Sequence, residues 1–165
     1  MSGPGRGSAI HTDGMTTRIT HWIDGKPYGG ITRRRASVHN PATGQVTGQV
    51  DLADVGTVDL AVAGASAAAT AWGRSSLATR TRVLFRFREL LAARTDDLAA
   101  IITAEHGKVL SDAAGEVTRG LEVVEFACGA THLLKGDFSE NVSTKVDVYS
   151  LRQALGVVAV VSPFN

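Results

Sequence analysis

The sequence predicts an α/β protein, because strand-like patterns stand at both ends of the chain and helix-like patterns lie between them. Val46, Val50 and Leu52 are spaced by even numbers of residues, as on one face of a strand. From Asp54 onward apolar residues recur at every third or fourth position, as on one face of a helix. Residues 155–161 are almost continuously apolar, which is typical of a strand buried on both faces of a parallel sheet.

Residues 1–18 differ from the rest of the chain in composition. They are rich in Gly, Ser and Thr and have no apolar period. Such a segment cannot bury enough apolar surface to offset the entropy of ordering, so it is predicted to be a disordered tail. Met15 stands just before the first structured segment, and translation could start at Met1 or at Met15.

Two turns and their flanking strands predict a small β-meander that ends near Leu52. Asp24-Gly25 is typical of a tight hairpin turn, in which both residues have positive φ. Residues 40–44, Asn-Pro-Ala-Thr-Gly, predict a second turn, since Pro presets φ and Gly accepts positive φ.

Four helices are predicted between the meander and the last strands. The first begins at Asp54 as its N-cap and ends near Gly73, the third ends within residues 105–108, and the fourth runs from about Ser111 to Leu134. The second helix is predicted to turn its apolar residues inward and its arginines to solvent: Val83, Leu84, Phe87, Leu90 and Leu91 against Arg80, Arg82, Arg86 and Arg88. A solvated helix face is a simpler explanation of these arginines than a nucleic-acid surface.

Composition excludes several classes of protein. The 165 residues are 44% hydrophobic and 20% charged with a net charge of +1, so no strong attraction to nucleic acid or to an anionic membrane is expected. No apolar run is expected to be long enough to cross a bilayer. One cysteine cannot form an intramolecular disulfide, which favours a reducing, cytoplasmic location.

That cysteine, Cys128, is interpreted as structural. It lies within a helical pattern beside Phe126 and Ala127, where a thiol commonly packs as a small apolar group. The five histidines have no metal-ligand spacing, so no metal is predicted.

Several short stretches together resemble the aldehyde dehydrogenase superfamily. These are "IDGK", "NPATGQV", the Ala-rich helix that ends at Trp72, "EHGK" and the terminal "SPFN", in the family's order and at its spacings over about residues 20–165. Within that family, "DAAGEVTRGLEVVEFAC" and "SENVSTKVDVYSLRQALGV" resemble the methylmalonate-semialdehyde dehydrogenases.

The resemblance implies that this sequence is the N-terminal fragment of the aldehyde dehydrogenase fold. Residues 19–144 would belong to the NAD-binding domain, residues 145–152 would form a strand of an oligomerisation arm, and residues 153–165 would form the first central strand of a Rossmann-like sheet. The catalytic domain would be absent from this sequence. The full-length form would be a homo-oligomer, either a dimer or a tetramer.

The resemblance also implies a chemistry. Such enzymes oxidise methylmalonate or malonate semialdehyde with NAD and transfer the acyl group to coenzyme A. Asn165 would donate a hydrogen bond to the oxyanion, since oxyanions require preorganised donors. Val161, Ser162, Pro163 and Phe164 would form a wall of the cofactor site. The family's nucleophile and general base match no residue here, so the isolated chain is expected to be inactive.

Arg119 is the candidate for substrate recognition. Relatives that act on carboxylated aldehydes place an arginine at the matching position of this helix, and a guanidinium binds a carboxylate through two hydrogen bonds. The alternative is a solvated arginine paired with Glu116 or Glu122.

Two further alternatives stay open for the whole chain. It could belong to another aldehyde dehydrogenase, such as a succinate-semialdehyde type, or it could be a non-catalytic module that binds a protein partner. The choice between NAD and NADP is also open.

Overall fold

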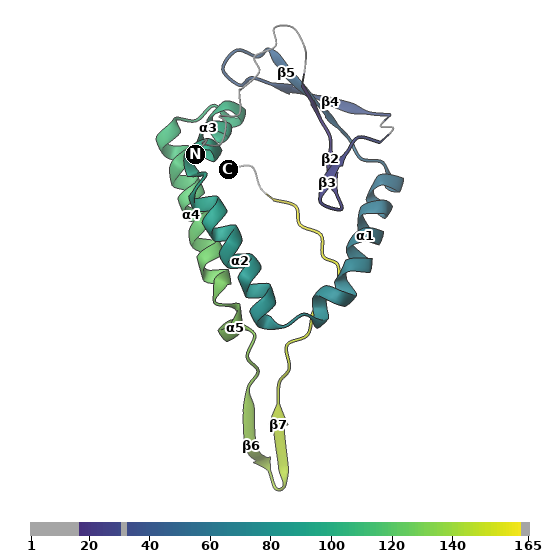
Figure 1. The fold of residues 1–165 in the computed structure, drawn as a ribbon, viewed down its shortest axis with the longest axis vertical. Helices are drawn as coiled ribbons and strands as arrows, with labels where there is room; N and C mark the ends of the chain where they lie inside the picture. The colour runs from purple at the N-terminus through teal and green to yellow at the C-terminus, as the bar shows by residue number, and fades with distance from the viewer. Residues whose placement is uncertain (1–16, 31–32, 163–165) are drawn as a thin grey trace, which may run out of the picture.

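The computed structural model describes residues 17–30 and 33–162, which form small sheets and helices around an open centre (Figure 1). Two sheets lie at one end, α1 (Val55–Arg74) lies on one side, and the other helices lie opposite it. The predicted tail falls outside the described residues except for its last two, Thr17 and Arg18. These two belong to a strand, so the tail prediction is wrong for them.

The N-terminal strands form two sheets rather than one meander. Strands β1 (Thr17–Ile19), β5 (Val46–Asp51) and β4 (Arg35–His39) form a sheet in the order β1-β5-β4, with β1 parallel to β5. Strands β2 (His21–Ile23) and β3 (Lys26–Tyr28) form a separate hairpin. The predicted meander is therefore wrong in connectivity, because sequence patterns do not specify which strands pair.

Both predicted turns are confirmed. Asp24 and Gly25 have φ values of 52° and 73°, as the hairpin turn requires. In the second turn the Asn40 side-chain oxygen accepts from the Ala42 N–H at 2.8 Å, and Gly44 has φ of 73°.

The helices after α1 are α2 (Leu77–Ala92), α3 (Thr95–His106), α4 (Leu110–Cys128) and α5 (Ala130–Leu133). The predicted N-cap of α1 is confirmed, because Asp54 Oδ1 accepts from the Thr57 N–H at 2.8 Å. The predicted fourth helix is shorter than expected. Gly129 separates α4 from α5, so the continuous helix to Leu134 is wrong.

A long hairpin projects from the helices at the end opposite the N-terminal sheets (Figure 1). It pairs β6 (Phe138–Ser143) with β7 (Val146–Tyr149), which lies inside the predicted arm strand. The sequence analysis missed β6, since "FSENVS" has an apolar residue at just two positions. Every residue of both strands is exposed.

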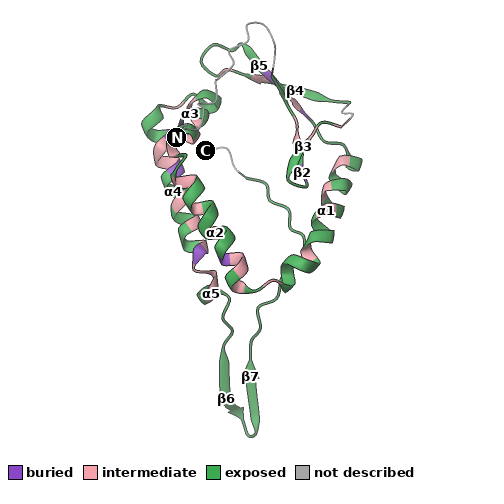
Figure 2. Cartoon of the chain, in the orientation of Figure 1, coloured by how far each residue is buried: buried purple, intermediate pink, exposed green. Residues whose placement is uncertain are grey.

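The predicted buried strand 155–161 is wrong in this structure. Residues 150–162 contain no strand and run as an extended segment through the open centre (Figures 1 and 2). Leu155 is 94% exposed and Val161 is 97% exposed. A strand needs a neighbour for its backbone hydrogen bonds, and no described strand pairs with this segment.

The core is small for a chain of this size. Its centre is Ala99 of α3 with Ala113 and Val117 of α4, and no large side chain among the described residues is fully buried. The chain exposes 13520 Å², whereas a compact monomer of 17.3 kDa exposes about 7,800 Å². Many apolar surfaces therefore have no partner within these residues.

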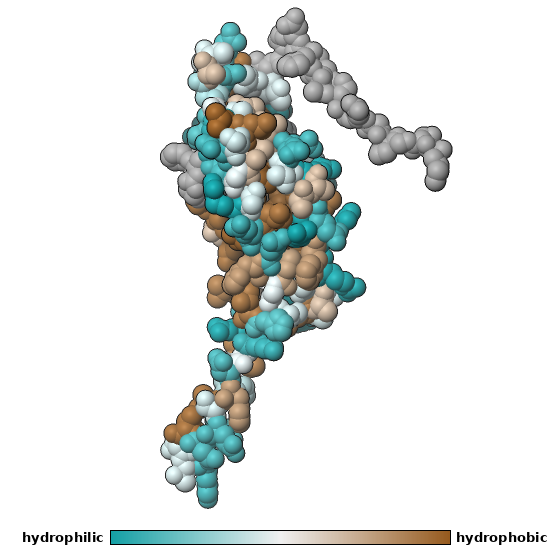
Figure 3. Space-filling view, turned by 90° about the vertical axis from the view of Figure 1, so that its left-hand side faces the viewer, coloured by the Kyte–Doolittle hydropathy of each residue, from teal (hydrophilic) through white to brown (hydrophobic). Residues whose placement is uncertain are grey.

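Helix α2 illustrates this shortage of partners. Leu84 and Leu91 are half-buried as predicted, whereas Val83, Phe87 and Leu90 are exposed, contrary to the inward face that was expected. Figure 3 shows hydrophobic side chains spread among hydrophilic ones over the side of the molecule that α2–α4 form.

Helix α1 is long and apolar enough to cross a membrane by length and composition, and the sequence reading had found no such segment. Much of its apolar character comes from alanines, and it contains Asp59 and Arg74. The core helix of a soluble protein passes the same test, so this finding is weak evidence for a membrane.

Candidate functional site

The residues that the sequence analysis selected lie on two elements. Val161 and Ser162 end the extended C-terminal segment and are exposed. Pro163, Phe164 and Asn165 lie outside the described residues. Arg119 lies on α4. No hydrogen bond or ion pair among the described residues joins Arg119 to Val161 or Ser162.

The packing of α4 decides where Arg119 points. Ala113 and Val117 are buried against α3. Arg119 follows Val117 by two residues, which is about 200° around a helix, so it faces away from that core and is exposed. Its guanidinium lies back over Gly115, and Nη1 is 3.7 Å from the point where a Cβ of residue 115 would stand.

Neither glutamate proposed as an alternative partner of Arg119, Glu116 or Glu122, forms an ion pair with it in the described part of the chain. Glu116 instead accepts a hydrogen bond from Lys108 Nζ, and both side chains are largely buried. The Lys108 ammonium lowers the pKa of Glu116 below its usual value, so the carboxylate is ionised at neutral pH.

The turn that carries Lys108 is held by a contact between two of the motifs. Gly107 ends α3 with φ of 88°, and a Cβ there would stand 3.0 Å from Pro41 Cγ. The "EHGK" turn thus packs against the "NPATG" turn, about 65 residues earlier in the chain.

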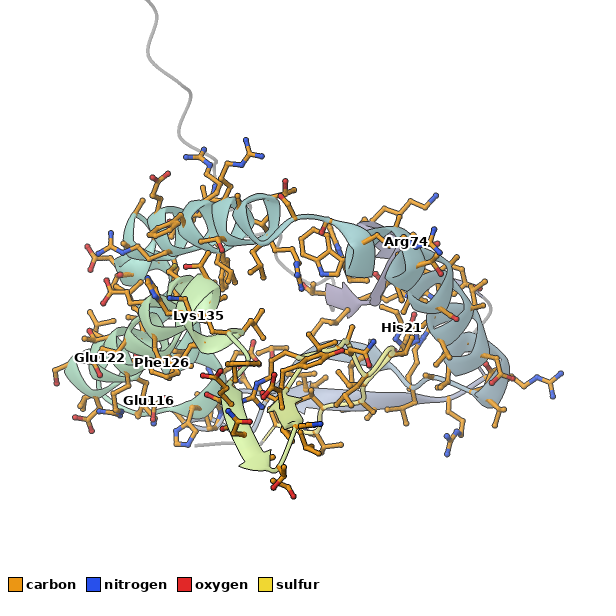
Figure 4. All side chains as sticks on the ribbon, turned by 90° about the horizontal axis from the view of Figure 1, so that it is seen from below. His21, Arg74, Glu116, Glu122, Phe126 and Lys135 are labelled. Carbon is orange, nitrogen blue, oxygen red and sulfur yellow. The ribbon has the colours of Figure 1, made fainter. Side chains whose placement is uncertain are left out.

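A groove between α1, the β2–β3 hairpin and the extended segment was not foreseen. It has a volume of about 440 Å³, and its lining is mainly apolar: His21, Trp22, Ile23, Ala53, Thr57, Val58, Ala61, Val62, Ala65, Val157 and Val158. Figure 4 shows His21 beside α1, opposite the side of the molecule where Glu116 and Glu122 lie. The polar side chains of this lining include those of His21 and Thr57.

Cys128 is buried, 8% exposed, at the end of α4. A neighbouring ion pair joins Arg88 Nη2 of α2 to Glu125 Oε1 of α4 at 2.7 Å. The burial of the thiol fits a packed structural role. Within residues 17–30 and 33–162, no group of three or more His, Cys, Asp or Glu residues could hold a metal ion.

Comparison with known proteins identifies the family. The family model described as "Aldehyde dehydrogenase family" matches residues 30–165. A malonate-semialdehyde dehydrogenase of Pseudomonas aeruginosa is 46% identical over 132 residues, which are 80% of this chain and 27% of that protein. The human mitochondrial acylating methylmalonate-semialdehyde/malonate-semialdehyde dehydrogenase is 37% identical over 158 residues, 96% of this chain and 30% of that protein.

Solved structures agree with the sequence matches. A candidate methylmalonate-semialdehyde dehydrogenase from Sinorhizobium meliloti, complexed with NAD, aligns with a TM-score of 0.86 and 41% identity over 92% of this chain and 31% of its own. The enzyme from Oceanimonas doudoroffii aligns with a TM-score of 0.76 and 45% identity over 84% of this chain and 28% of its own.

This chain thus spans about three tenths of the length of the relatives that it matches, and the matching portion is their N-terminal one. The α/β fold expected for that portion is confirmed by the structural alignments. With the family model matching residues 30–165, the chain belongs to the aldehyde dehydrogenase family.

Proposed function

We propose that these residues are part of an NAD-dependent enzyme that oxidises malonate or methylmalonate semialdehyde and transfers the acyl group to coenzyme A. The observation that supports this most directly is the identity of 37–46% to relatives named for these semialdehydes, extending over 80–96% of the chain. Homo-oligomers and a cytoplasmic location belong to the same proposal.

In the proposed reaction an enzyme thiolate adds to the aldehyde carbon, and the carbonyl oxygen becomes an oxyanion. Bound NAD would supply the acceptor for the hydride of that carbon, and the thiol of coenzyme A would then attack the resulting thioester and release the enzyme thiolate. The side-chain amide of Asn165 would donate a hydrogen bond to the oxyanion. Val161, Ser162, Pro163 and Phe164 would orient the cofactor.

Arg119 would bind the substrate carboxylate. Its guanidinium is exposed and has no ion pair to either neighbouring glutamate among the described residues, so its hydrogen-bond donors are available. A planar guanidinium can hold a carboxylate by two parallel hydrogen bonds, which an uncharged aldehyde cannot form.

The test is a fusion enzyme in which residues 1–165 replace the matching N-terminal segment of the Pseudomonas aeruginosa relative. NADH formation would be measured with malonate semialdehyde and with propanal, each with NAD and coenzyme A. We expect a clear preference for malonate semialdehyde, and Arg119→Gln should raise its KM at least about ten-fold. Propanal oxidation should change little in that variant.

Two results would contradict the proposal. Equal loss of activity on both aldehydes in Arg119→Gln would remove the carboxylate role. A preference for propanal in the unmodified fusion enzyme would remove the substrate class, and oxidation of succinate semialdehyde in its place would favour the related alternative.

One observation favours the second candidate, a non-catalytic module that binds a protein partner. The exposed apolar residues of α1, α2 and the extended segment form surfaces that a partner chain could cover. The nucleotide sequence after codon 165 separates the two candidates, because an open frame that continues into the family's catalytic motifs supports the enzyme.

A further inference from the structure

Arg119 stands between two carboxylates of its own helix. Glu116 lies three residues before it and Glu122 three residues after it, and residues three apart are neighbours on a helix surface. A guanidinium that pairs with a neighbouring glutamate has fewer donors and less charge for a substrate carboxylate. The availability of Arg119 therefore depends on what those two carboxylates do.

Glu116 is the stronger competitor of the two. An acidic residue on the N-terminal side of a basic one forms the more favourable helix pair, and Glu122 stands on the unfavourable side. The Glu116 side chain is also 22% exposed, so solvent screens it less than it screens the exposed Glu122.

Lys108 engages Glu116 from another element. Lys108 Nζ donates to Glu116 Oε1 from the turn after α3, and the Lys108 side chain is 15% exposed. The turn itself is held by Gly107, whose backbone is left-handed and which packs against Pro41. Electrostatics agree with the geometry, because Lys108 lowers the pKa of Glu116 more than Arg119 does.

Gly115 lies beside the guanidinium of Arg119 on the same helix. The Arg119 guanidinium lies back over this glycine, with Nη1 3.7 Å from the position of a Cβ. A Cβ at that distance would make an ordinary van der Waals contact, so position 115 leaves room for the guanidinium to lie along α4.

We infer that Lys108 is a positioning residue that holds the Glu116 carboxylate away from Arg119 and so leaves the guanidinium free to bind a carboxylated aldehyde. This inference rests on the proposed role of Arg119. It adds a residue from the "EHGK" turn to the determinants of substrate choice, although that residue need not touch the substrate.

The experiment compares Lys108→Met, Glu116→Gln and the double variant in the fusion enzyme, with Lys135→Met as a control for loss of one lysine charge. In Lys108→Met we expect the KM for malonate semialdehyde to rise about ten-fold, because Glu116 then pairs with Arg119. The kcat and the propanal kinetics should change less than about two-fold. The double variant should recover the original KM within about two-fold, since no carboxylate remains at 116 to compete.

Other outcomes would overturn the inference. Equal effects on both aldehydes, no effect on either, or a double variant no better than Lys108→Met would each show that Lys108 does not act through Glu116. A crystal structure of the Lys108→Met fusion enzyme gives a readout without activity: the Glu116 carboxylate should lie within about 4 Å of the Arg119 guanidinium. A Glu116 that stays away from Arg119 would contradict the mechanism.

The kinetics of Arg119→Gln and Lys108→Met separate an error in the proposed role of Arg119 from an error in the role of Lys108. If Arg119→Gln affects both aldehydes equally, the carboxylate role of Arg119 is wrong. If Arg119→Gln impairs malonate semialdehyde oxidation alone but Lys108→Met does not, Arg119 binds the substrate carboxylate and Lys108 does not position it.

Discussion

Asp51 joins three strands through one buried carboxylate. Arg18 of β1 donates to it from Nη2 at 2.7 Å, and Arg35 of β4 donates from Nε at 3.0 Å. Asp51 itself ends β5, so the ion pairs connect all three strands of the sheet. The guanidinium groups lower the pKa of Asp51 below its usual value of 3.8.

The first prediction follows from this shift. Because the pKa of Asp51 is lower in the folded state than in the unfolded state, the ionised carboxylate stabilises the fold at any pH above the unfolded-state pKa. This contribution is lost as the pH falls through the lower, folded-state pKa. Thermal unfolding of the fusion enzyme should therefore show a falling melting temperature below about pH 4. Asp51→Asn should be less stable at pH 7 and should lose less on acidification. If the melting temperature of Asp51→Asn falls with pH as steeply as that of the unmodified protein, Asp51 is not a source of the acid sensitivity.

Gly107 tests the contact between the two turns. An L-residue with φ of 88° is strained, and a Cβ there would also press on Pro41 Cγ at 3.0 Å. Gly107→Ala should lower the free energy of unfolding by about 2 kcal/mol. Gly44→Ala is the matched control, since Gly44 has φ of 73° with nothing within 4 Å of its Cβ position. Its cost should be smaller, and equal losses would show that the Pro41 contact adds nothing.

At the scale of elements, the β2–β3 hairpin is fitted closely onto α1. A Cβ at Gly64 of α1 would stand 2.5 Å from Asp24 Oδ1 in the hairpin turn. Asp24 is exposed, and its carboxylate is the far end of a flexible side chain, so it can rotate aside when position 64 carries a Cβ. The hairpin and α1 together form most of the apolar groove.

In Gly64→Ala the Asp24 side chain has to move aside, so the variant should gain less than the roughly 1 kcal/mol that alanine usually contributes in place of a helix glycine. The double variant Gly64→Ala/Asp24→Gly removes the crowding carboxylate and should be more stable than Gly64→Ala. Gly73→Ala, on the same helix with nothing within 4 Å of its Cβ position, should be neutral or slightly stabilising. Thermal unfolding of the unmodified protein, these three variants and the single variant Asp24→Gly gives the comparison, and additive effects at 24 and 64 would argue against a close contact.

At the scale of the whole molecule, exposed apolar surface dominates. Leu155, Val160 and Val161 are each more than 80% exposed, on a backbone that pairs with no strand in the described part of the chain. Open strand-like edges and apolar patches recruit other chains. Covering the apolar side chains of this segment would therefore require residues from outside the described part of the chain.

The purified 165-residue chain should accordingly self-associate and should form no NADH from malonate semialdehyde, NAD and coenzyme A. Sedimentation velocity would report the association, and absorbance would report NADH. The sole thiol, Cys128, is buried, and no hydrogen bond among the described residues joins it to Glu125 or His132, which line a pocket with it, so Cys128→Ser should change neither measurement. Activity that disappears in Cys128→Ser would instead identify Cys128 as a nucleophile.

Local patterns in the sequence were enough for the family, for the starts of α1 and α4 and for the turns. Asp54 caps α1, and Asp24-Gly25 and Gly44 take positive φ, because these features depend on a few neighbouring residues. The family resemblance is likewise confirmed, since it rests on motifs at set spacings.

Tertiary structure decided what depends on distant partners. The parallel pairing of β1 with β5, the β6–β7 hairpin and the unpaired segment 150–162 all depend on which strand is available as a neighbour, and local periodicity carries no such information. The same holds at Arg119. Its charge and helix were evident from the sequence, but the pairing of Glu116 with Lys108 emerged only when α3 and α4 were brought together, because ion pairs are chosen by distance in space.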